Sequence, residues 1–226
     1  MVADAAAIAA ILADPDIPAA LSDRTLIQMG TIAPAESRDF LAQVTAAGGH
    51  YLEAPVLGSI PQAQNGSLIV MVGSTPAQFA QWQPVLQCVG ESVVAIGPVG
   101  AGAALKLALN QLIGSLTTAF ALSLALVQRE QIPVDTFMDI VRHSALYAPT
   151  FDKKLDRMCD RNFDQPNFPT KHLLKDMRLF AQAATTAGLS PDLAETVATV
   201  VERAITQGLA EQDYSALYEV VNPPLT

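Results

Sequence analysis

One predicted helix, running from about residue 100 to Gln131, constrains the fold more than any other feature, because its residues 107–127 carry no charge. At 1.5 Å per residue, such a helix spans roughly 45 Å. Roughly 20 uncharged residues can cross a bilayer, so a transmembrane helix is one interpretation. Polar residues such as Asn110 and Ser115 interrupt the stretch, and it has no flanking aromatic belt or Lys/Arg cluster. We therefore favour a helix buried on all sides in an all-helical domain.

The residues before Gly97 alternate between strand and helix patterns. Short apolar or β-branched segments are separated by Gly/Pro turns and by helices that open with proline. This alternation predicts an α/β layer with a largely parallel sheet. The expected strands are 24–29, 50–56, 67–72 and 92–97, the expected helices are 3–12, 34–49 and 75–90, and the expected loop is 58–66.

After Gly97 the pattern becomes entirely helical. The expected helices beyond the long one are 134–142, 150–160, 170–187, 192–208 and 214–221. The segment GPVGAG connects the α/β part directly to the long helix. The predicted fold class is therefore α/β followed by all-α, with one domain at 1–98 and a second at 99–226.

Composition excludes several classes of protein. The chain has 226 residues, of which 50% are hydrophobic and 15% charged, which excludes a disordered chain. A formal net charge of -9 without a basic stripe argues against nucleic acid as a partner. Residues 1–16 lack the charged and apolar regions of a secretory signal, and Cys88 and Cys159 are too few for a disulfide framework. We therefore expect a cytoplasmic protein with no membrane partner.

No metal site is predicted either. The three histidines stand alone, without a second ligand at metal-binding spacing. Four aspartates between Asp152 and Asp164 are interleaved with Lys153, Lys154, Arg157 and Arg161. We interpret this segment as an ion-paired, solvated helix face that runs into a loop.

Lys106 is the only charged residue between Glu91 and Arg129, and Asn110 follows it by one helical turn on the same face. Two interpretations are open from the residues alone. The lysine can extend its ammonium to the surface along an apolar helix. Alternatively, it is a catalytic lysine that exchanges a proton with a substrate hydroxyl, which Asn110 orients through its amide.

Three further features point to a small anionic ligand. Gly58 and Ser59 open a loop whose backbone N–H groups can approach a ligand. Gly30 and Thr31 follow a strand, where ligands bind in open α/β sheets. A Lys-Asp pair begins at Lys175 on a predicted helix. Each feature also has an ordinary explanation, a turn in the first two cases and a solvated helix face in the third.

Taken in order, four stretches resemble the β-hydroxyacid dehydrogenase family: GTIAPAES, GGHYLEAPVLGSIPQAQNGSLIVMVG, GPVGAGAALKLALNQLIGS and HLLKDMRLF. The resemblance covers the chain from Met1 to about Pro224. It implies part of a Rossmann-like nucleotide-binding domain, followed by a 6-phosphogluconate dehydrogenase-like C-terminal domain built on one long central helix.

The resemblance also implies roles for individual residues. Lys106 corresponds to the family's catalytic acid/base. The implied substrate-binding residues are Gly58, Ser59 and Asn110. The implied cofactor-binding residues are Thr31, Lys175, Val2 and Ala3. Two positions depart from the family pattern, since Leu57 replaces a substrate-binding hydroxyl and Gly30 stands where serine is usual.

The function implied by the resemblance is hydride transfer between NAD or NADP and a small hydroxy acid or aldehyde acid. The long helix is expected to form the core of a homodimer or homotetramer. The family's G-x-G-x-x-G motif occurs nowhere in the sequence, so we expect an N-terminal part of roughly two βαβ units to be missing. The alternative function is therefore a truncated, non-catalytic remnant that only dimerises through its helical domain.

Overall fold

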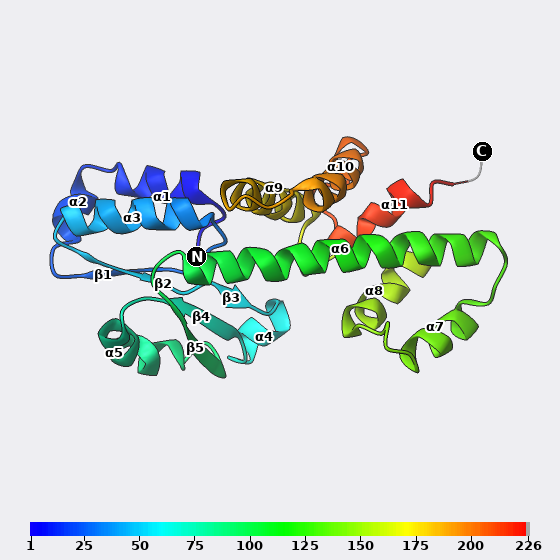
Figure 1. Cartoon of the computed structure of the whole chain (residues 1–226), viewed down its shortest axis with the longest axis horizontal. Helices are drawn as coiled ribbons and strands as arrows, with labels where there is room; N and C mark the ends of the chain where they lie inside the picture. Colours follow the sequence, from blue (N-terminus) through cyan, green and yellow to red (C-terminus); the bar gives the residue numbers. More distant parts are fainter. Residues whose placement is uncertain (225–226) are drawn as a thin grey trace. The chain divides into compact units, whose positions relative to one another are not determined.

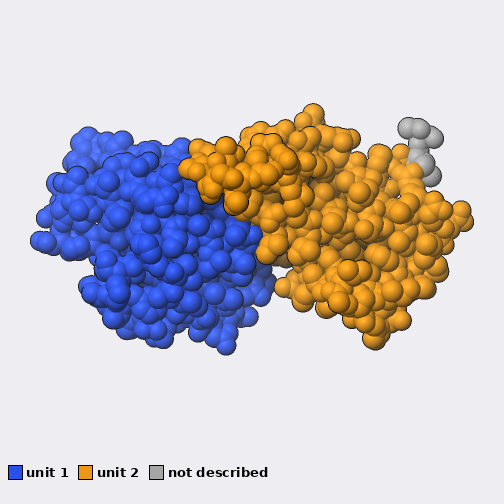
Figure 2. Space-filling model, viewed as in Figure 1, with its two compact units in different colours: residues 1–109 blue, residues 110–226 orange. Residues whose placement is uncertain are grey.

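The computed structural model describes residues 1–224. The chain divides into two compact units, Met1–Leu109 and Asn110–Thr226, which are coloured separately in Figure 2. The first unit contains a five-stranded sheet and its covering helices, and the second is helical. The predicted fold class, α/β followed by all-α, is confirmed.

The sheet of the first unit is mixed, so the prediction of a largely parallel sheet is only partly correct. β1 pairs with β2 and β4 pairs with β5 in parallel, whereas β2 and β3 pair with β4 in the antiparallel direction. The strands are β1 (Thr25–Gln28), β2 (His50–Glu53), β3 (Val56–Leu57), β4 (Ile69–Gly73) and β5 (Ser92–Gly97).

The mixed pairing arises because β2 and β3 form one extended stretch that changes partner at Ala54 and Pro55. Ala54 donates its N–H to Gln28 at 2.8 Å, on the β1 side. Pro55 has no N–H to donate, but its carbonyl accepts the N–H of Met71 at 2.9 Å, on the β4 side. The predicted strand 50–56 therefore pairs in parallel with β1 and antiparallel with β4.

Helices cover both faces of this sheet (Figure 1). Successive side chains of β2 point to opposite faces, so Tyr51 packs with Ile8 and Phe40 of α1 and α3, while Leu52 packs with Leu86 of α5. The helices of the first unit are α1 (Ala5–Leu12), α2 (Asp16–Ala20), α3 (Pro34–Ala46), α4 (Ile60–Gln64) and α5 (Pro76–Leu86).

Two of these helices differ from the expectation. α2 was not predicted, and α4 lies within the predicted loop 58–66. α4 forms because Pro61 occupies its first turn and Gln62 accepts the N–H of Ser59 at 3.0 Å, which satisfies a free donor at the helix start.

The predicted helices after residue 97 are confirmed, with ends within about two residues of the expected positions. Within residues 98–224 the only β pairing is an isolated bridge between Pro169 and Asp213. The helices are α6 (Ala101–Arg129), α7 (Val134–Arg142), α8 (Pro149–Cys159), α9 (Thr170–Thr186), α10 (Asp192–Thr206), the 3-10 helix η1 (Tyr214–Leu217) and α11 (Tyr218–Val221).

α6 is not buried on all sides, which corrects the expectation for the long apolar helix. One face packs into the core of the second unit through Phe120 and Leu124, and Phe120 stacks on Phe151 of α8 with ring centroids 4.6 Å apart. On another face, Leu122 and Leu126 are 59% and 62% exposed. Among the described residues, α6 is the one helix whose length and hydropathy would allow it to cross a membrane.

The predicted solvated face of α8 is also only partly correct. Arg142 and Asp152 form a surface ion pair at 2.6 Å. Lys154, in contrast, is buried with its Nζ 2.8 and 2.9 Å from the two carboxylate oxygens of Asp213, and 4.2 Å from the ring centroid of Tyr214. Lys154, which was expected on the solvated helix face, is therefore buried.

Candidate functional site

The strands of the first unit end in register. Gln28 pairs with Glu53, Glu53 with Gly73, and Gly73 with Gly97, so the last residues of β1, β2, β4 and β5 form one row across the sheet. Ligands of open α/β sheets bind beyond the carboxyl ends of strands. Because β2 and β4 are antiparallel, β1 reaches this row from one side and β4 and β5 reach it from the other, so the loops after β1 and β5 leave the row in opposite directions.

The loop after β1 is held by the buried side chain of Gln28. Its Oε1 accepts the N–H of Gly30, and its Nε2 donates to the Gly30 carbonyl at 3.1 Å. A Cβ on Gly30 would lie 2.7 Å from the Val2 carbonyl oxygen, which explains why glycine replaces serine here. The structure thus brings Val2, and with it Ala3, beside the loop that carries Thr31.

Lys106 lies half-buried in the second turn of α6, within the first unit. The first turn of this helix packs closely on β4, because a Cβ on Gly102 would lie 2.8 Å from the carbonyl oxygen of Met71. Glu53, which the sequence analysis did not single out, is fully buried at this contact. Its carboxylate accepts the backbone N–H groups of Gly100 and Ala103.

Gly58 and Ser59 follow β3, at the far end of the extended stretch from Glu53. Four residues of strand, or about 13 Å, separate Leu57 from Glu53. Gly58 has a φ of +139°, and a Cβ there would lie 2.6 Å from Leu68 Cδ2. The Ser59 hydroxyl donates to Oε1 of Gln62 at 2.9 Å, so its proton is used within α4.

In the second unit, Asn110 and the Lys-Asp pair of α9 come together. Asn110 Nδ2 donates to Asp176 Oδ2 at 2.5 Å, and Lys175 Nζ lies 2.9 Å from Asp176 Oδ1. Asp176 is only 1% exposed, so the solvated-face interpretation of this pair is wrong. Gly114 allows the close approach, because a Cβ there would lie 2.9 Å from Met177 Sδ.

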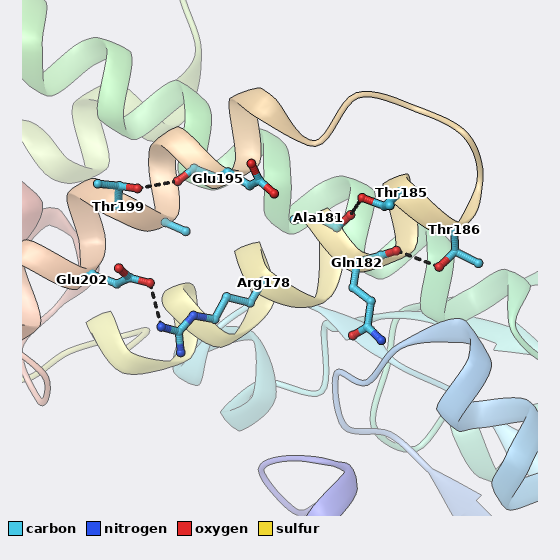
Figure 3. Close-up of a pocket in the computed structure, with 9 residues that line it drawn as sticks. Arg178, Ala181, Gln182, Thr185, Thr186, Glu195, Thr199 and Glu202 are labelled. Carbon is cyan, nitrogen blue, oxygen red and sulfur yellow. Dashed lines mark hydrogen bonds and ion pairs between the residues drawn. The ribbon is translucent and has the colours of Figure 1, made fainter.

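A separate polar pocket of about 480 Å³ lies between α9 and α10 (Figure 3). None of the predicted site residues lines it. Arg178 pairs with Glu202 at 2.7 Å, and the threonine hydroxyls donate to carbonyls of their own helices, as Thr185 does to Ala181 at 3.0 Å. Arg178 and the threonine hydroxyls of this pocket are thus engaged within α9 and α10.

The chain thus combines a mixed sheet with helices on both faces, a long helix with a lysine in its second turn, and a helical unit. Two family models match the chain. The NAD binding domain of 6-phosphogluconate dehydrogenase matches residues 1–97, and the NAD-binding domain of NADP-dependent 3-hydroxyisobutyrate dehydrogenase matches residues 100–221.

Individual relatives point to the same family as the two family models. Glyoxylate/succinic semialdehyde reductase 1 of Arabidopsis thaliana is 32% identical over 195 residues, which cover 86% of this chain and 67% of the relative. The chloroplastic reductase 2 of the same plant is 30% identical, with 88% and 56% covered. The crystal structure of a Salmonella typhimurium 3-hydroxyisobutyrate dehydrogenase is 28% identical, with a TM-score of 0.85 over 97% of this chain and 77% of that one.

The chain therefore belongs to the 3-hydroxyisobutyrate dehydrogenase family of β-hydroxyacid dehydrogenases. The expected class, oxidoreductase, and the expected cofactor, NAD or NADP, are confirmed by this membership. The chain spans between about half and two thirds of the length of the two plant relatives.

The residues of the first unit that the resemblance assigns to the cofactor lie together. Gly30 and Thr31 form a loop after the carboxyl end of β1, and Gly30 closely approaches the backbone of Val2. The pyrophosphate-binding motif G-x-G-x-x-G does not occur in the sequence.

Proposed function

We propose that this protein transfers a hydride between NAD(P) and a small hydroxy acid or semialdehyde, with Lys106 as the acid/base. The observation that carries the proposal is the anchoring of the start of α6, next to Lys106, on β4 and on Glu53 at the end of β2. The names of the relatives, reductases of glyoxylate and succinic semialdehyde and a dehydrogenase of 3-hydroxyisobutyrate, support the substrate class.

The bound nicotinamide supplies or accepts the hydride. Lys106 takes the hydroxyl proton during oxidation and returns it during reduction. Asn110 uses its Nδ2 to donate to Asp176, which leaves its Oδ1 to accept a hydrogen bond from the substrate. Backbone N–H groups at Gly58 and Ser59 bind the substrate carboxylate, since the Ser59 hydroxyl proton is engaged by Gln62.

Four residues are proposed to contact the cofactor. The contact between Val2 and Gly30 supports a shared surface formed by Val2, Ala3 and Thr31 on the nicotinamide side. Lys175 is proposed to close over the cofactor, and its Nζ forms an ion pair with the buried Asp176. The matches to family models at 1–97 and 100–221 support a nucleotide-binding domain at 1–98 and a helical domain at 99–226.

The assembly is proposed to be a homodimer or homotetramer in the cytoplasm. The exposed leucines of α6, which include Leu112 and Leu122, form an apolar face that a second copy would cover. Cys88 and Cys159 are free thiols, which suits a reducing compartment. The net charge of -9 supports the absence of a nucleic-acid partner.

The direct test is cofactor-dependent turnover of glyoxylate, succinic semialdehyde and 3-hydroxyisobutyrate, measured for this chain and for the product of the longest reading frame that contains it. Lys106→Met is expected to lower kcat by about 10²- to 10⁴-fold, the usual contribution of a positioned acid/base. Lys153→Met removes an exposed lysine of α8 and is the matched control. Equal turnover by both variants would refute the role of Lys106.

The alternative of a non-catalytic remnant is not favoured. Asn110 and Lys175 keep contacts with a buried carboxylate that a purely dimerising domain does not require. Titration with NADH and NADPH separates the two functions, because a remnant does not bind either cofactor.

A further inference from the structure

Glu53 has the geometry of a helix cap supplied from a distant part of the chain. Gly100 immediately precedes α6, and its carbonyl accepts the N–H of Ala104 at 3.0 Å, so it occupies the capping position. One oxygen of Glu53 accepts the Gly100 N–H and the other accepts the Ala103 N–H. In a local capping box, two different side chains accept these two N–H groups, whereas here one carboxylate accepts both.

No residue at the usual position can cap this helix. Gly100 has no side chain to cap with, and its φ of +99° is a backbone conformation that other residues rarely adopt. The serine, threonine or aspartate that normally caps a helix would be strained at position 100. The capping carboxylate comes instead from the end of β2, about 50 positions earlier in the sequence.

Two glycines leave the space that this carboxylate fills. A Cβ on Gly73 would lie 2.6 Å from Glu53 Oε2, and a Cβ on Gly102 would lie 3.2 Å from Glu53 Oε1. The side chain is therefore enclosed between β4 and the first turn of α6. Burial raises the pKa of Glu53, although the N–H groups of Gly100 and Ala103 oppose that shift.

From these contacts, and resting on the proposed function, we infer that Glu53 is a positioning residue for Lys106. Ala103 and Lys106 are three residues apart on α6, and adjacent turns of a helix move together. The bonds to Gly100 and Ala103 fix the rotation and depth of the first turn relative to the end of β2. That placement determines where the Lys106 ammonium lies relative to the bound substrate.

The first measurement does not depend on catalysis. In Glu53→Gln, one of the two N–H groups faces an amide NH2 in place of a carboxylate oxygen. We expect amide hydrogen exchange across residues 100–106 to accelerate at least about tenfold, while exchange in α9 stays unchanged. Unchanged exchange across 100–106 would overturn the anchoring.

The second measurement compares the effect of Glu53→Gln on kcat with its effect on cofactor binding. We expect Glu53→Gln to lower kcat by about 10²-fold, as a displaced catalytic group does, while the Kd for NAD(P)H stays within about threefold. Thr75→Ala is the matched control, because Thr75 caps α5 by accepting the Gln78 N–H at 3.3 Å and no proposed site residue lies on that helix. It should lower Tm and leave kcat unchanged.

A second variant keeps the inference testable where Glu53→Gln does not fold. Glu53→Asp retains the carboxylate with one carbon less, and we expect its kcat to lie well above that of Glu53→Gln or to be measurable where the latter is unfolded. Equal kcat in wild type and Glu53→Gln, or equal losses of kcat in the Asp and Gln variants, would overturn the positioning role. Wild-type turnover by Lys106→Met would instead overturn the proposed function, and the exchange experiment would still report on the anchoring.

Discussion

Lys154 and Asp213 form a buried ion pair in which one ammonium contacts both carboxylate oxygens, at 2.8 and 2.9 Å. Asp213 also accepts the Ser215 hydroxyl at 2.7 Å and the Asn167 N–H at 3.2 Å. The pair joins α8 to η1. Burial favours the neutral acid, but Lys154 and the donors of Ser215 outweigh it and lower the pKa of Asp213.

Breaking this pair is predicted to destabilise the protein. Lys154→Met leaves a buried carboxylate without its counter-ion, so we expect a loss of about 3–5 kcal/mol in the free energy of unfolding. Arg178→Met breaks the exposed pair with Glu202 and should cost less than about 1 kcal/mol. Urea unfolding of the two variants measures the difference, and similar losses would contradict the prediction.

The raised pKa of Tyr51 predicts that the folded protein loses stability at alkaline pH. Burial raises its pKa to about 12, with the Ser37 hydroxyl 3.0 Å away opposing the shift. A phenol that ionises near 10 when unfolded and near 12 when folded favours the folded state fully below pH 10. That contribution is lost as pH rises from 10 to 12, by up to about 2.7 kcal/mol. Tyr51→Phe should show a shallower fall in that interval when unfolding is measured at several pH values.

Burial also raises the pKa of Tyr214 and Tyr218, so the Phe variant at position 51 should reduce the alkaline loss without abolishing it. A slope identical to that of wild type would show that Tyr51 ionises equally in both states.

Asp176 is predicted to determine how Asn110 presents its amide. Asp176→Ala removes the acceptor of the 2.5 Å bond, so the Asn110 amide can rotate. We expect the KM for substrate to rise about tenfold or more, in line with about 1–3 kcal/mol for an unsatisfied buried group. Gln182→Ala, an exposed change on the same helix, should leave KM unchanged. In a double-mutant cycle with Asn110→Ala, additive effects would rule out the coupling.

The apolar face of α6 is predicted to be a subunit interface. Leu122→Ser is expected to lower the oligomeric state measured by sedimentation, because it places a hydroxyl in an apolar contact. Leu193 of α10 is also 59% exposed, so Leu193→Ser is the matched control and should leave the assembly unchanged. A wild-type monomer, or an unchanged assembly in Leu122→Ser, would contradict the interface.

Local patterns were sufficient for the helical half of the chain. Val134–Arg142 was predicted with both ends correct, because its apolar positions repeat at helical spacing and Pro133 precedes it. The mixed sheet was not predictable in this way, because nothing in the local pattern around Pro55 indicates that the strand changes partner. α4 was missed because Gly58 and Gly66 dominate the pattern of that segment.

In the candidate site too, local sequence patterns predicted some residues and could not predict others. Lys106 and Asn110 could be selected because they are one turn apart on an otherwise apolar helix. Glu53 could not, because both groups it binds are backbone N–H groups about 50 positions away, and no side-chain pattern encodes such a bond.

The extended stretch from β2 to β3 has a consequence for insertions and deletions. Its two halves pair with different neighbours, so both registers are fixed independently at β1 and at β4. Adding or removing one residue at Ala54 or Pro55 would put the halves out of phase and force one of them to exchange its inward and outward side chains. Substitutions there change local packing, whereas a change of length would redistribute the side chains of a whole strand between the two faces of the sheet.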